Sequence, residues 1–203
     1  NGHVRKDAEV VVNGGAIGFN DVATDLEIYR GNVYGGGRGI DLDATNHTIS
    51  KTAGVVLGNA SITIGSGGEA AEDLLIYHNI YGGGSMASVG TISYDESGDV
   101  TNVAEGTGTT NITINGGQIG INGTNNGRVL RAGRGRPGEE TIGSVTIDYS
   151  ELTYVNNTNV TFNGGTIKGC IFGAGDNGHT WGDTHVTMNG GTLGYTENTD
   201  PTT

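Results

Sequence analysis

The His and carboxylate side chains near the end of this 203-residue chain have the types that metal chemistry uses. The segment "HTWGDTH" places His179, Asp183 and His185 close together, and His nitrogens and carboxylate oxygens ligate zinc. No zinc motif of fixed spacing surrounds them. We therefore favour the alternative, a connecting loop whose Trp181 covers the end of a stack, and predict no metal here.

Two acidic pairs offer the loop oxygens that Ca²⁺ prefers. They are Asp41 with Asp43 and Asp95 with Asp99. Neither pair matches the EF-hand spacing or the nonapeptide Ca²⁺ repeat. We expect no cofactor, and Ca²⁺ is the ion that the sequence leaves open.

Arginines recur just after a glycine-rich motif, at Arg38 and Arg134. Arg binds carboxylate and sulfate groups with two parallel hydrogen bonds, so the pair could clamp an acidic ligand. The alternative, which we favour, is ion pairing with neighbouring acids such as Glu139 and Glu140.

Aromatic residues recur at one repeat position, at Tyr34, Tyr81 and Phe172. If they face outward, they form a strip suited to sugar rings. If they face inward, they pack on one another, and this packing is the favoured interpretation. In either case they are candidate binding residues.

Three further tyrosines, Tyr94, Tyr149 and Tyr154, lie in segments that interrupt the repeat. Binding residues are often found on loops that a rigid scaffold positions. We therefore expect these tyrosines to make exposed contacts.

The composition limits the function classes. Glycine accounts for 40 residues and proline for 2, and 10 Lys and Arg face 22 Asp and Glu for a net charge of −12. An acidic chain lacks the basic face that nucleic acid needs and is not attracted to anionic membranes. We therefore expect no nucleic-acid partner. We also expect no membrane insertion, because no run of 18 apolar residues occurs.

The elements that position these residues follow from an internal repeat. Its first half reads "EVVVNGGAIG", "SITIGSGGEA", "NITINGGQIG", "NVTFNGGTIK" and "HVTMNGGTLG", with starts near 9, 61, 111, 159 and 185. Its second half reads "NVYGGGRG", "NIYGGGSM", "RVLRAGRG" and "CIFGAGDN". Because glycines 164 and 190 are 26 residues apart, one repeat closes in about that length.

Alternation within each strand predicts a stacked core. In "NITIN" the residues Ile112 and Ile114 point one way, and Thr113 points the other. Stacked copies then give an apolar ladder inside and a threonine ladder outside. The Asn-Gly-Gly motif is interpreted as the corner after each strand, since glycine reaches positive φ and asparagine tolerates it. The corner residues are Asn13, Asn115, Asn163, Asn189, Gly14, Gly67, Gly116, Gly164 and Gly190.

The segments 40–58, 87–110 and 136–158 lack the glycine motifs. Each holds either a second, irregular coil or an inserted hairpin or loop, and the missing motifs favour insertion. We predict one domain over 1–203 that is part of a longer chain.

These repeats resemble those of large glycine-rich, adhesin-like surface proteins of bacteria, and more broadly the right-handed parallel β-helix shared with pectate lyases. The resemblance covers most of the chain apart from the insertions. It implies an all-β, right-handed parallel β-helix (β-solenoid) of about five coils. It implies no catalytic residues, and the polygalacturonase-like Asp pair and Gly-His-Gly motif are absent.

We therefore expect an extracellular, cell-surface or secreted structural and adhesive module that is not an enzyme. Its expected partners are a host or microbial glycan, a surface protein, and neighbouring repeats or other copies at the coil ends. Two alternatives remain: a lyase or hydrolase acting on acidic glycans, and a filament subunit that assembles end to end.

Overall fold

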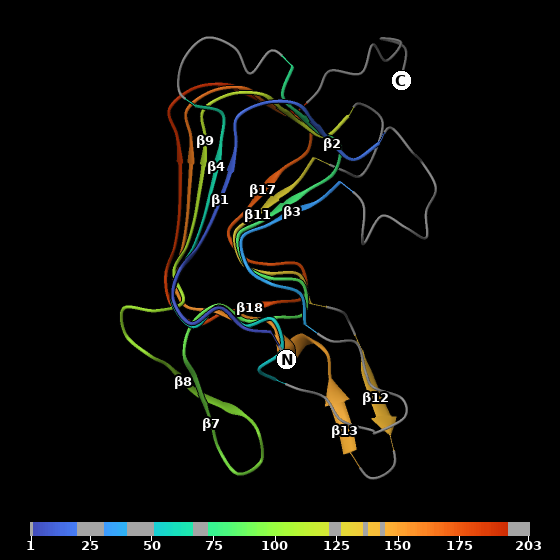
Figure 1. Cartoon of the computed structure of the whole chain (residues 1–203), viewed down its shortest axis with the longest axis vertical. Helices are drawn as coiled ribbons and strands as arrows, with labels where there is room; N and C mark the ends of the chain where they lie inside the picture. Colours follow the sequence, from blue (N-terminus) through green and yellow to red (C-terminus); the bar gives the residue numbers. More distant parts are fainter. Residues whose placement is uncertain are drawn as a thin grey trace, which may run out of the picture.

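Short β-strands, most of them parallel, make up the described part of the computed structural model (Figure 1). The structure describes residues 2–19, 31–39, 51–66, 73–121, 127–135, 138–142 and 145–194. Within these ranges one 3-10 turn and no α-helix occur. The predicted all-β class and the parallel stacking of repeats are confirmed.

The longest strands stack into a five-stranded parallel sheet. In spatial order they are β1 (Ala8–Val12), β4 (Ala60–Ile64), β9 (Thr110–Ile114), β15 (Thr158–Phe162) and β19 (Thr184–Met188). Every strand pairs with its neighbour at the equivalent repeat position, so that Val10, Ile62 and Ile112 lie in one column. Sequence order and spatial order coincide, as expected for repeats that stack on their neighbours.

Two further sheets follow the same order. One contains β2 (Ala16–Ile17), β5 (Leu75–Ile76), β10 (Gln118–Ile119), β16 (Thr166–Ile167) and β20 (Thr192–Leu193). The other contains β3 (Val33–Tyr34), β6 (Ile80–Tyr81), β11 (Val129–Leu130) and β17 (Ile171–Phe172). A further column consists of the bridged residues Val4, Val56 and Val89 and the pair β14 (Tyr154–Val155) and β18 (His179–Thr180), and the backbone N–H of Val89 donates to the carbonyl oxygen of Tyr154.

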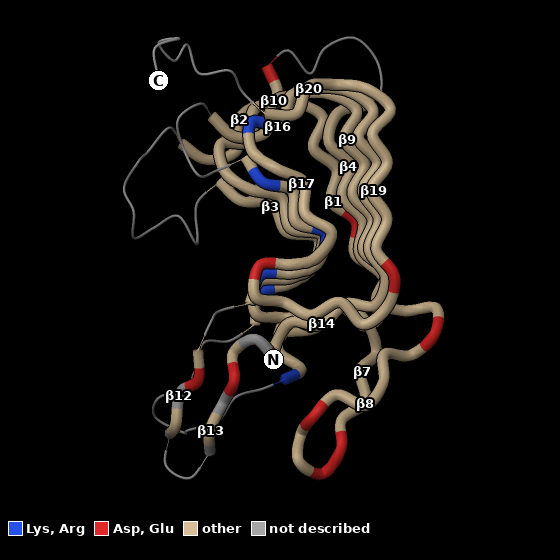
Figure 2. The backbone as a smooth tube through the Cα atoms, turned by 180° about the vertical axis from the view of Figure 1, so that it is seen from behind, with Lys and Arg blue, Asp and Glu red and all other residues tan. Residues whose placement is uncertain are grey.

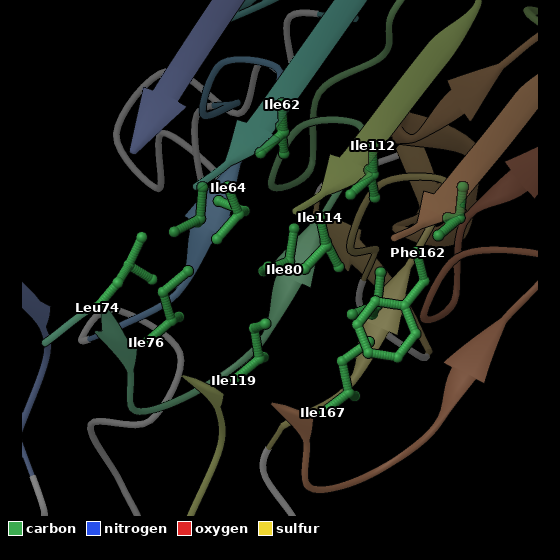
Figure 3. Packing of buried hydrophobic residues seen from close by; sticks show 13 residues of the cluster. Ile62, Ile64, Leu74, Ile76, Ile80, Ile112, Ile114, Ile119, Phe162 and Ile167 are labelled. Atoms are coloured by element: carbon green, nitrogen blue, oxygen red, sulfur yellow. The ribbon is translucent and has the colours of Figure 1, made fainter. Parts of the chain in front are cut away.

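The three sheets enclose an apolar core of stacked Ile, Val, Leu and Phe side chains (Figure 3). Ile62, Ile64, Ile112, Ile114 and Phe162 are fully buried. Their burial follows the alternation of the sequence, because strand residues of one parity share a face. A second, smaller cluster lies beside the bridged column and contains Val56, Ala60, Val89, Ala132 and Val155.

An asparagine ladder runs along the corner after the first sheet. Nδ2 of Asn163 donates to Oδ1 of Asn115, and Nδ2 of Asn189 donates to Oδ1 of Asn163, both at 2.8 Å. The positive φ that the corner needs falls on the second glycine of the motif, for example 82° at Gly117 and 96° at Gly165. Among the described non-glycine residues, positive φ occurs at Met86 and Asn177. The corner asparagines therefore act through their side chains, and Gly67 lies outside the described residues.

Two antiparallel hairpins project from the stack toward the same end of its cross-section (Figure 1). The first pairs β7 (Ile92–Tyr94) with β8 (Val100–Val103). The second pairs β12 (Glu139–Ile142) with β13 (Val145–Asp148) and is followed by the 3-10 turn η1 (Ser150–Leu152). They fall within the predicted insertions 87–110 and 136–158. Of the third insertion, residues 40–50 lie outside the described residues.

The last stacked repeat exposes the positions that are buried in the repeats before it. Val186, Met188 and Leu193 are exposed, whereas their partners Val160, Phe162 and Ile167 are buried. No described residue packs over them. None of the described helical segments is long and apolar enough to cross a membrane.

Candidate ligand-binding site

The recurring aromatic residues face away from the core, so the favoured interpretation that they face inward is wrong. Val33 and Ile80 belong to the core cluster, so Tyr34 and Tyr81, the next residue in each strand, point to the other face. Their rings stack with centroids 4.9 Å apart and an interplanar angle of 8°. Tyr81 is only 3% exposed, so it offers no open face to a sugar ring.

The rest of this aromatic column changes along the stack. Leu130 follows Tyr81 and is buried, while Phe172 follows Leu130 and is 43% exposed. The aromatic residues therefore do not form a continuous open strip, and packing on one another accounts for the tyrosine pair. Phe172 is the member that remains open to a ligand.

The predicted arginine clamp lies next to this column. Arg38, Ser85, Arg134 and Asp176 form one line of β-bridges. Arg38 is exposed, and Nε of Arg134 lies 3.5 Å from Oδ2 of Asp176. Arg134 thus forms an ion pair, as the favoured alternative expects, but its partner is Asp176, which occupies the equivalent position of the next repeat.

Burial governs the protonation of the stacked tyrosines. It raises the pKa of Tyr81 well above the ordinary range, and the charge of Tyr34 would raise it further. It also raises the pKa of Tyr34, although the nearby Arg134 guanidinium and the hydroxyl of Ser85 oppose that shift. Both hydroxyls stay protonated at neutral pH.

We predict that the free energy of unfolding falls as the pH rises above 10.0, the ordinary tyrosine value. The unfolded chain then releases tyrosine protons that the folded chain retains, so deprotonation favours unfolding. Urea unfolding at one pH unit below and one above this value measures the fall. Tyr81→Phe keeps the ring but removes the proton, so the fall should shrink, and an unchanged fall in this variant would contradict the assignment.

Side chains from separate segments meet beside the two hairpins and form what we call the insertion cluster: Lys51, Tyr94, Glu151, Tyr154 and His179. Nζ of Lys51 lies 4.9 Å from the ring centroid of Tyr94 and 3.8 Å from Oε2 of Glu151. The rings of Tyr154 and His179 stack with centroids 4.6 Å apart. Because β14 pairs with β18 in parallel, the stacking of repeats itself places His179 against Tyr154.

The insertion cluster has an acidic environment. Burial is the main cause that raises the pKa of Tyr94, followed by the charges of Tyr154 and Glu151. Burial also raises the pKa of Tyr154, with further contributions from Glu151, Asp148 and Asp99. Partly buried aromatic rings next to carboxylates suit a sugar, which offers C–H groups to the rings and hydroxyl donors to the carboxylates.

Other predicted site residues lie elsewhere or have local roles. Tyr149 is buried, so the exposed contact predicted for it is wrong. Oδ1 of Asp95 accepts a hydrogen bond from the backbone N–H of Asp99 at 2.9 Å, which closes the turn of the β7–β8 hairpin. Asp41 and Asp43 lie outside the described residues. Across the described ranges, no group of three or more His, Cys, Asp or Glu side chains could hold a metal ion.

Sequence reasoning missed a buried arginine. Arg131 is 3% exposed and occupies the repeat position of Gly35, Gly82 and Gly173. Its Nε donates to the carbonyl oxygen of Phe172 at 3.1 Å. Burial lowers the pKa of Arg131. In "RVLRAGRG" an arginine stands where the other repeats carry glycine, and this difference could have marked the buried arginine in the sequence.

No protein-family model, curated protein or solved structure matches this chain.

Proposed function

We propose that the chain is an extracellular structural and adhesive module of a bacterial surface protein. In this proposal it winds as a right-handed parallel β-helix of about five coils, and the hairpins are insertions between coils. The stack provides rigidity, and glycan binding occurs at the insertion cluster.

The observation that carries the proposal is the assembly of the insertion cluster. Tyr94 comes from the β7–β8 hairpin, Glu151 from η1, and Tyr154 and His179 from neighbouring repeats. The hydrophobic core does not require these residues, because none of them belongs to either core cluster. Polar and aromatic side chains that a rigid scaffold brings together without a packing role are typical of binding surfaces.

A glycan array with and without Ca²⁺ tests the proposal. We expect specific binding by the wild-type chain and its loss in a Tyr94→Ala, Tyr154→Ala double variant. Phe172→Ala and Arg134→Ala serve as matched controls at the aromatic and arginine columns and should retain binding. No binding of the wild-type chain to acidic, neutral or amine-bearing glycans would contradict the proposal, and loss only in the control variants would move the site to those columns.

A second candidate, end-to-end assembly, is favoured by the exposed apolar residues of the last repeat. Among the described residues, no strand covers the core ladder that Val186, Met188 and Leu193 present, and open strand edges associate readily. Light scattering should then show a particle mass that increases with protein concentration, and Met188→Glu should reduce that increase. A constant monomer mass would contradict this candidate.

An enzyme acting on acidic glycans is the least supported alternative. The carboxylates of Asp99, Asp148 and Glu151 influence Tyr154, and their negative charge would repel an acidic substrate at this site.

A further inference from the structure

The insertion cluster already holds one ammonium group, that of Lys51. This group faces the ring of Tyr94, pairs with the carboxylate of Glu151 and donates a hydrogen bond to the carbonyl oxygen of Gly98. An aromatic face, a carboxylate and a carbonyl oxygen complement the charge and the N–H donors of a primary ammonium group. Tyr94 and Gly98 belong to the β7–β8 hairpin and Glu151 to η1, so two insertions build this ammonium cage.

The cage is open to solvent, and Lys51 holds its place weakly. The side chains of Lys51 and Glu151 are 33% and 35% exposed. An ion pair with this exposure contributes little to stability, because water screens the two charges and both side chains lose freedom when they pair. Lys51 also retains a long flexible stem that allows its ammonium to move into water. A ligand ammonium could therefore replace it at small cost.

The surrounding charge favours a cation over an anion. Figure 2 shows Asp and Glu residues along both hairpins, and Asp99 and Asp148 lie near enough to Tyr154 to raise its pKa. The stacked pair of Tyr154 and His179 gives a second aromatic surface beside the cage. A sugar that stacks there would place an amino substituent near these carboxylates. The attraction between the opposite charges strengthens binding and speeds the encounter of protein and ligand.

We infer that the insertion cluster recognises glycans that carry a primary ammonium group, which replaces the ammonium of Lys51 between Tyr94, Glu151 and Gly98. The inference rests on the proposed glycan-binding function and names its ligand class. Lys51 is an internal competitor in this scheme. It keeps the cage filled in the absence of ligand and lowers the affinity for amino sugars.

The test titrates the full chain with a glucosamine tetramer and with the same tetramer fully N-acetylated, at one pH where the free sugar amine is protonated. The ring size and the linkages are matched, so the two ligands differ at their amino groups. We expect the amine-bearing tetramer to bind about tenfold more tightly, a difference of about 1.4 kcal/mol. Lys51→Met should tighten that binding about tenfold more, because it removes the competitor and retains the stem. Glu151→Gln should weaken it by a similar factor and leave the N-acetylated ligand unaffected.

The gain expected for Lys51→Met cannot arise from damage to the fold, which would lower affinity. Equal binding of the two tetramers, or no gain in Lys51→Met, would overturn the inference while glycan binding at the cluster stands. If neither tetramer binds and the array is silent as well, the proposed function fails together with the inference.

Discussion

Phe162→Ala is expected to lower the free energy of unfolding by about 3–5 kcal/mol, the usual cost of removing a buried phenylalanine side chain. Phe162 is 0% exposed and lies in the core between Ile114 and Met188 of the neighbouring repeats. Truncation removes apolar contacts with both neighbouring repeats and leaves a cavity that a stacked sheet cannot close. Urea unfolding followed by circular dichroism measures the loss.

Phe172→Ala provides the matched control, since the same side chain is removed from a position that is 43% exposed. We expect a change within about 0.5 kcal/mol, as for surface positions in general. Comparable losses in the two variants would show that Phe162 does not lie in the core, and the assigned register of the repeats would then be wrong.

Gly82→Ala is expected to destabilise the fold by about 3 kcal/mol, the upper end of the usual cost of overpacking. A Cβ atom on Gly82 would overlap the backbone carbonyl oxygen of Arg131 and would lie 3.1 Å from the Cβ of Thr110. Both obstacles belong to the next repeat, and neither is the flexible end of a side chain. The substitution therefore has to push two repeats apart.

Gly14→Ala is the control for the glycine substitutions. Nothing lies within 4 Å of a Cβ atom at Gly14, and its φ is not among the positive ones. A gain of about 0.4–1 kcal/mol is expected, because alanine reduces the freedom of the unfolded chain. Thermal unfolding of the two variants side by side checks this, and a tolerated Gly82→Ala would contradict the close approach of the repeats.

The stacking of the core could be predicted because every repeat carries the same alternation. Ile112 and Ile114 share a parity that recurs in the other repeats, and in-register pairing follows directly from it. The corner was predicted only in part. Its glycine and asparagine content was informative, but which glycine takes positive φ depends on the local path of the backbone.

The insertion cluster could not be predicted, because its members are separated in the sequence and lie together only through the stack. Lys51 and Glu151 fall in different insertions, and His179 reaches Tyr154 through a two-residue strand pair that has no alternation to mark it. Tyr94 and Tyr154 were candidates as loop tyrosines. Their proximity to an ammonium and to carboxylates required the structure.

The central claim is that ligand binding occurs at the insertion cluster, and NMR of the tyrosine rings tests it most directly. The ligand is a glycan that the array identifies, titrated into the chain with ring-labelled tyrosine. We predict that the ring signals of Tyr94 and Tyr154 shift with ligand concentration while those of Tyr34 and Tyr81 stay unchanged. Shifts confined to Tyr34 and Tyr81, with Tyr94 and Tyr154 unaffected, would contradict the account and place binding at the aromatic column.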